Sequence, residues 1–98
     1  SVEHGEELAR ALGCLGCHST DGTRLVGPSF QRLYGHEHTL SDGTTVLTDD
    51  AYIIESIRDP NAKIAEGFQP NLMPAFGESQ LSDEDIQDII AFIKTLSE

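Results

Sequence analysis

The chain has 98 residues and a mass of 10.7 kDa, and its 38% hydrophobic and 23% charged positions are typical of one small globular domain. No apolar run approaches the roughly 20 residues of a membrane span, which excludes such a span within this sequence. Six Lys and Arg against 17 Asp and Glu give a net charge of −11, which disfavours nucleic acid and anionic lipid as partners.

A first helix is predicted from Glu3 to Gly13. Acidic residues in its first turn suit the positive end of the helix dipole, and Leu8, Ala11 and Leu12 form an apolar stripe. This helix leads directly into the two cysteines of the chain.

Because the sequence has no Trp and few aromatic residues, the hydrophobic core is expected to be thin. Small domains usually compensate for a thin core with a disulfide, a metal or a large cofactor.

Both cysteines lie in the motif Cys14-Leu15-Gly16-Cys17-His18, and C-x-x-C-H is typical of covalent haem attachment. Residues three apart share one face of a helical turn, so Cys14 and Cys17 can form thioethers with one haem edge while His18 binds the iron. Two alternatives stay open. A redox-active dithiol would usually lie among alternating strands and helices, which are missing here. A zinc site could recruit His18, His36 or His38, although the single residue between the last two suits zinc poorly.

Residues 38–47 predict a short β-hairpin. Two runs of residues that favour strands flank Ser41-Asp42-Gly43, and Gly43 can adopt the positive φ that the turn requires. A ribbon of this length is marginal alone and must pack on another part of the chain.

A third helix is predicted from about Asp50 to Arg58. Asp49 or Asp50 would cap its start, and Asp59-Pro60 would end it, because proline disfavours helix in the residue before it. The apolar side of this helix, which we expect to face the core, consists of Ile53, Ile54 and Ile57.

Met73 is the one methionine of the chain, and it lies between Gly67 and Gly77 in a stretch that proline and glycine prevent from forming regular structure. A lone methionine can simply fill a gap in a core. A loop flanked by two prolines instead favours holding a thioether against iron, which would make Met73 the second axial ligand of a low-spin haem. An open sixth position would permit peroxide chemistry or ligand binding.

The last helix is predicted to begin at a capping box formed by Ser82 and Asp85, with acidic residues in its first turn. Apolar residues then recur at helical spacing on one face, and they are Ile86, Ile89, Ile90, Ile93 and Leu96.

Taken in order, these elements resemble the class I cytochromes c over nearly the whole chain: the first helix, the C-x-x-C-H motif, Gly27-Pro28, the helix before Pro60, Met73-Pro74 and the last helix. The resemblance implies an all-α fold in which the N- and C-terminal helices cross and a third helix packs around a covalent haem. The hairpin near 38–47 would be an insertion. The family's helix crossing falls near Gly5 or Ala9 against Phe92 or Ile93.

The same resemblance implies further site residues. The Pro28 carbonyl would accept a hydrogen bond from His18. The position of an Arg that contacts a haem propionate in many relatives is His36 here, so the possible propionate contacts are Tyr34, His36, Arg24 and Arg32. Apart from that possibility, His36 and His38 are expected to be exposed loop histidines.

A narrower resemblance is to the cytochrome c domain at the C-terminal end of subunit II of caa3-type haem-copper oxidases, carried by residues 17–23, 26–30 and 40–46 and by Gly67-Phe68. It implies one-electron transfer from a donor protein through a His/Met haem c to the dinuclear copper centre of the same subunit, on the outer side of the cytoplasmic membrane. The chain would then be one cytochrome c domain over residues 1–98, excised from a larger membrane-bound subunit, monomeric in isolation and not itself an enzyme.

The alternatives to the oxidase fusion are a freestanding periplasmic class I cytochrome c, a haem peroxidase and a zinc-binding module. A lysine-rich docking face is missing, because acidic residues dominate the charge. We therefore expect an uncharged docking patch, formed by Gly16, Val26, Leu72 and Pro74.

Overall fold

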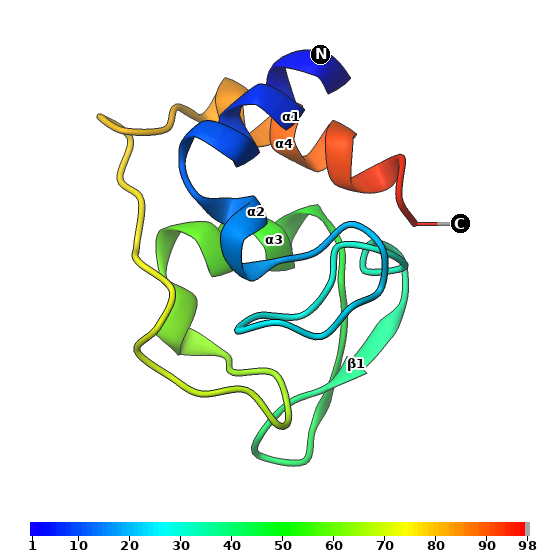
Figure 1. Cartoon of the computed structure of the whole chain (residues 1–98). Helices are drawn as coiled ribbons and strands as arrows, with labels where there is room; N and C mark the ends of the chain where they lie inside the picture. Colours follow the sequence, from blue (N-terminus) through cyan, green and yellow to red (C-terminus); the bar gives the residue numbers. More distant parts are fainter. Residues whose placement is uncertain (98) are drawn as a thin grey trace.

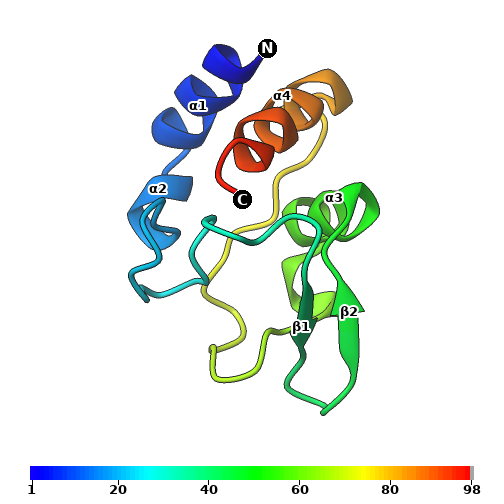
Figure 2. The same cartoon turned by 90° about the vertical axis from the view of Figure 1, so that its right-hand side faces the viewer.

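The structure is a computed structural model that describes residues 1–97. Its elements, in chain order, are α1 (Val2–Ala11), α2 (Cys14–Cys17), β1 (Glu37–Thr39), β2 (Thr45–Leu47), α3 (Asp50–Arg58), the 3-10 helix η1 (Pro60–Ala62) and α4 (Asp83–Lys94). Figures 1 and 2 show α1 and α4 side by side, α3 next to α4, and the hairpin at the far end of the molecule from α1. The predicted all-helical fold with a small hairpin is confirmed. No helix within residues 1–97 is long and apolar enough to cross a membrane.

The first helix is displaced from its predicted bounds at both ends. It begins at Val2, because the Ser1 side chain accepts a hydrogen bond from the His4 backbone N–H and caps it. It ends at Ala11, and Gly13 follows with a φ of 82°, which a helix cannot contain. Ala11 is exposed, so the predicted stripe was wrong at that position, and Gly5 and Ala9 are the buried residues of this helix.

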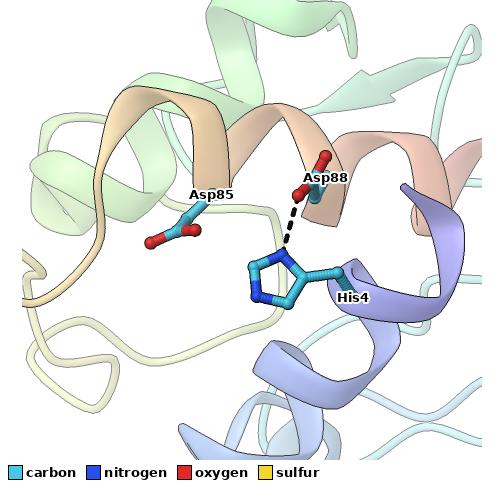
Figure 3. A group of neighbouring side chains, drawn as sticks. All are labelled: His4, Asp85 and Asp88. Carbon is cyan, nitrogen blue, oxygen red and sulfur yellow. Dashed lines mark hydrogen bonds and ion pairs between the residues drawn. The ribbon is translucent and has the colours of Figure 1, made fainter.

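Gly5 sets the distance between α1 and α4. A Cβ atom at this position would lie 1.9 Å from the Asp88 backbone oxygen and 2.9 Å from the Ile89 nitrogen. The small residue was therefore predicted correctly, but its partner lies about one turn earlier in α4 than the expected Phe92 or Ile93. At the edge of this crossing, His4 Nδ1 lies 2.8 Å from Asp88 Oδ2 (Figure 3). The nearby Asp85 is half-buried, and its carboxylate accepts a hydrogen bond from the Ser82 backbone N–H.

The other two long helices match their predictions. Asp49 caps α3 by accepting a hydrogen bond from the Tyr52 backbone N–H, and the capping box of Ser82 and Asp85 is present at the start of α4. The isoleucines of both helices meet Phe30 and Leu81 in one core, and the fully or nearly fully buried members are Ile53, Ile57, Ile86, Ile89, Ile90 and Ile93. Ile54 and Leu96 are half-buried against the same core.

The hairpin packs on the segment that follows η1, as so short a ribbon requires. Its strands pair in antiparallel register, with His38 opposite Val46, and Gly43 has the expected positive φ of 88°. At its tip, Leu40 forms a bridge with Ala65, and the Glu66 backbone N–H donates to the Thr39 carbonyl over 3.0 Å. The hairpin thereby holds the beginning of the segment that leads to Met73.

Candidate functional site

The residues predicted to attach the haem and bind its iron, together with Pro28, line one cavity of about 530 Å³, within the usual range for a cofactor pocket. One wall comes from α2 and the loop after it, another from α3 and α4, and a third from the segment around Met73. Its lining is mostly apolar, and the residues that matter chemically are Cys14, Cys17, His18, Pro28, Thr48 and Met73.

His18 is held in one orientation by its neighbours. Its Nδ1 lies 2.7 Å from the Pro28 carbonyl oxygen, the contact implied by the class I resemblance. A carbonyl can only accept, so Nδ1 carries the proton and Nε2 keeps a lone pair for a metal. Burial lowers the pKa of His18, and the bond to Pro28 opposes that shift in part. The lowered pKa favours the neutral imidazole, which is the form that binds metals.

Two further contacts fix the plane of this ring. The Phe30 ring stacks on it with centroids 4.8 Å apart and planes 11° from parallel. Gly27 lies so close that a Cβ there would stand 2.5 Å from His18 Cε1 and 2.8 Å from Nδ1. The imidazole thus has little room to tilt.

Cys14 and Cys17 lie one helical turn apart, half-buried in the same cavity wall, and they are not joined by a disulfide. Burial raises the pKa of the Cys14 thiol, and the neighbouring Cys17 adds to the shift. A redox-active dithiol needs the opposite, a lowered thiol pKa. The direction of this shift does not favour a reactive thiolate at Cys14.

The zinc alternative also lacks support from the arrangement. Within residues 1–97, the side chains close enough to share a metal ion are His4, Asp85 and Asp88, on the outer edge of the helix crossing. This group contains no residue of the C-x-x-C-H motif. Its geometry is explained by the ion pair between His4 and Asp88 and by the capping role of Asp85.

Met73 is half-buried and lines the same cavity as His18, in a segment without helix or strand. Two hydrogen bonds donated by backbone N–H groups hold this segment in place. The Asn71 N–H donates to Asn61 Oδ1 over 2.8 Å, and the Phe76 N–H donates to the Ile57 carbonyl over 3.0 Å. A thioether and an imidazole nitrogen therefore face one apolar space, as a His/Met haem iron requires.

Thr48 is a cavity residue that sequence reasoning missed. It is 0% exposed, and its Oγ1 has no hydrogen-bond partner although a buried hydroxyl normally has one. This hydroxyl fits a cofactor that supplies the hydrogen-bond partner from within the cavity. A large apolar ring with a polar edge, such as haem, fits both this hydroxyl and the apolar walls. No sequence signal marks Thr48, because a polar residue between a strand and a helix is ordinarily exposed.

The four predicted propionate contacts lie outside the lining of the cavity. The Tyr34 hydroxyl donates to Asp50 Oδ1 over 2.5 Å, and His36 is exposed with its Nε2 3.2 Å from the Ser97 carbonyl. Arg32 is exposed at a positive φ of 59°, and Arg24 donates to the Gly67 carbonyl. Arg24, Arg32 and His36 are exposed, whereas Tyr34 is half-buried against the core.

His38 differs from its predicted exposure. It is half-buried, lines the cavity, and its Nε2 lies 3.2 Å from the Leu33 carbonyl oxygen, because the hairpin folds back over the loop before it. The predicted uncharged patch does lie on the surface. Val26 and Leu72 are 51% and 54% exposed and also line the cavity, so they form part of its apolar rim.

Comparisons with known proteins agree with this geometry. The family model described as "Cytochrome C oxidase, cbb3-type, subunit III" matches residues 1–93. Cytochrome c-551 of Pseudomonas denitrificans is 40% identical over 45 residues, which are 46% of this chain and 54% of that protein, so the match spans about half the length of this relative. Among solved structures, cytochrome cH from Methylobacterium extorquens has the same fold, with a TM-score of 0.69 over 97% of this chain and 98% of that one at 21% identity.

Proposed function

The chain belongs to the cytochrome c family whose model is described as cytochrome c oxidase, cbb3-type, subunit III, and from that membership we propose how its residues serve electron transfer. Cytochromes c bind haem c covalently and carry electrons, so this protein is an electron carrier and not an enzyme. The observation that carries the proposal is the single apolar cavity lined by Cys14, Cys17, His18 and Met73.

We assign each of these residues one role. Cys14 and Cys17 would attach the haem through two thioethers, and the His18 Nε2 and the Met73 sulfur would hold its iron. Pro28 fixes the tautomer and orientation of His18 through the 2.7 Å bond to Nδ1. Bound haem supplies an iron that alternates between Fe(II) and Fe(III). The residues around it keep the same two ligands in place in both states, and their apolar side chains exclude water.

The test is the visible absorption spectrum of the purified protein, oxidised and reduced with dithionite, repeated after acid-acetone extraction. We expect a red protein whose c-type reduced band survives extraction and whose oxidised form has a far-red band from sulfur on iron. Met73→Ala should lose the far-red band, whereas Cys14→Ala should weaken covalent retention of haem. A colourless wild-type protein would contradict the proposal, and a high-spin spectrum would move the function toward ligand binding or peroxidase chemistry.

We further propose that the electron acceptor is a terminal oxidase. The name of the family model supports a cbb3-type oxidase as the acceptor. The sequence resemblance supports instead the dinuclear copper centre of a caa3-type subunit II. In that case this domain would be tethered at the outer side of the cytoplasmic membrane. The likeness to cytochrome c-551 is equally consistent with a freestanding periplasmic carrier. Stopped-flow mixing of the reduced protein with an isolated copper domain and with a cbb3-type oxidase separates these acceptors by rate.

The donor would dock on the apolar rim of the cavity. Val26 and Leu72 are exposed there, and the net charge of −11 provides no basic ring for steering. Electron transfer from the donor should therefore depend only weakly on salt. A steep fall in rate between low and high ionic strength would contradict an uncharged docking surface.

A further inference from the structure

Arg24 connects two loops on different sides of the cavity. It lies in the loop that follows the C-x-x-C-H motif, and its Nη2 donates a hydrogen bond to the Gly67 carbonyl, 43 positions further along the chain. Its guanidinium carbon also lies 4.1 Å from the centre of the Phe68 ring. One side chain thus contacts two successive residues of the segment that leads to Met73, through a charge-assisted hydrogen bond and a cation–π contact.

Gly67 is shaped for this contact. Its φ is +82°, and a Cβ atom there would stand 3.1 Å from Arg24 Nη2 and 3.6 Å from Nη1. Glycine therefore both permits the turn and leaves room for the guanidinium to lie against the backbone.

The segment that carries Met73 is held by an arginine at each end. At the downstream end, Arg58 Nη1 donates to the carbonyls of Phe76 over 3.1 Å and Leu81 over 2.7 Å. At the upstream end, Arg24 contacts Gly67 and Phe68, and Phe68 lines the same cavity as Met73. Arg58 is largely buried whereas Arg24 is exposed, so the upstream end is the weaker of the two attachments.

We propose that Arg24 is a positioning residue for Met73: it holds residues 67–68 against the loop after the C-x-x-C-H motif and so keeps the Met73 sulfur at the iron. The inference rests on the proposed function, in which Met73 is an axial ligand. It predicts that loosening this contact lets the segment swing away from the cavity, which exposes the iron to competing ligands without unfolding the helices.

The experiment measures how fast imidazole replaces the Met73 sulfur in the haem-loaded ferric protein, followed as loss of the far-red band after stopped-flow mixing. Arg24→Ala should accelerate the replacement by about tenfold, which corresponds to 1.4 kcal/mol. The replacement rate of Arg24→Lys should lie between those of the wild type and Arg24→Ala, because lysine keeps the charge but lacks the planar guanidinium. The matched control is Arg10→Ala, which removes another exposed arginine, paired with Glu6 over 3.2 Å on α1, and should leave the rate unchanged.

Phe68→Leu tests whether the two contacts act together. The double variant with Arg24→Ala should be less than additive, because the ring and the guanidinium lose the same contact. Urea unfolding of each variant, followed by far-UV circular dichroism, separates a local effect from general destabilisation. Positioning predicts a larger change in replacement rate than in the equilibrium constant for unfolding.

Three results would overturn the inference. The first is an imidazole replacement rate of Arg24→Ala within about twofold of the wild-type rate, and the second is an equal acceleration in Arg10→Ala. The third is an acceleration in Arg24→Ala no larger than the change in its equilibrium constant for unfolding. The proposed function fails in a different way, since a wild-type ferric protein without a far-red band would lack Met73 ligation altogether. A wild-type protein that shows the band, together with an unaffected Arg24→Ala variant, refutes the positioning role alone.

Discussion

The confinement of His18 by Gly27 gives the sharpest prediction of this structure. In Gly27→Ala, the new Cβ would stand 2.5 Å from Cε1, 2.8 Å from Nδ1 and 3.0 Å from Nε2 of the imidazole. Ordinary carbon contacts are about 3.5–4.0 Å long, so the ring must move by about 1 Å. Such a movement strains or breaks the 2.7 Å bond between Nδ1 and the Pro28 carbonyl.

The expected cost is the sum of two effects. Overpacking of this kind costs about 1–3 kcal/mol, and losing a neutral hydrogen bond costs about 0.5–1.5 kcal/mol. A loss of about 2–4 kcal/mol in the free energy of unfolding is therefore expected, which lowers the melting temperature of a domain of this size by roughly 10–20 °C. Because the same movement tilts the proposed iron ligand, the visible spectrum should gain high-spin character.

Thermal unfolding of the haem-loaded protein and its room-temperature spectrum measure both effects. Gly77→Ala is the matched control, because a Cβ at Gly77 meets nothing within 4 Å and its φ is not in the left-handed region. That variant should stay near the wild type in both measurements. A Gly27→Ala protein that keeps a low-spin spectrum and loses less than about 0.5 kcal/mol would refute the confinement of His18.

Three further predictions concern other parts of the chain. Thr48→Val should destabilise the haem-loaded protein by about 1 kcal/mol in urea unfolding, because we expect bound haem to supply the hydrogen-bond partner of the buried hydroxyl. A variant more stable than the wild type would show that the hydroxyl has no partner in the haem-loaded protein either. Gly5→Ala should lose about 3 kcal/mol or more, because its Cβ would lie 1.9 Å from the Asp88 carbonyl oxygen, and an unchanged urea midpoint would contradict the close crossing. Hydrogen bonding at the helix crossing, where His4 Nδ1 lies 2.8 Å from Asp88 Oδ2, holds the pKa of Asp88 below its usual value, so the stability from this carboxylate is present above the unfolded-state pKa and lost as pH falls through the folded-state value. Asp88→Asn should therefore lower the free energy of unfolding at pH 7, and in acid the variant and the wild type should become equally stable. A difference in stability that does not change with pH would contradict this.

Much of the fold and of the motif could be predicted from local rules. The start of α4 at Ser82 was predicted correctly, and the start of α3 to within the two candidate caps Asp49 and Asp50, of which Asp49 is the cap. A cap can be predicted in this way because it acts on backbone groups only three residues away. The Cys14–Cys17 turn and the irregular segment around Met73 were likewise predicted from spacing and from proline and glycine. Each of these depends on interactions between near neighbours in sequence.

Surface polar side chains could not be assigned in this way. Tyr34, His36, Arg24 and Arg32 were proposed as propionate contacts, yet none of them lines the cavity. The direction of a long side chain on a loop depends on where the rest of the chain lies, and spacing carries no information about that. His38, expected at the surface, became a cavity residue for the same reason.

The sequence by itself thus determined the helices, the haem motif and the candidate axial ligands, because spacing and backbone chemistry act over a few residues. Only the tertiary structure decided which distant residues meet. It brought Met73 to the cavity of His18, left the Thr48 hydroxyl without a partner inside that cavity, and set Arg24 against Gly67 and Phe68. These contacts join residues tens of positions apart, and they form only when the packing of α1, α3 and α4 has fixed the paths of the loops between them.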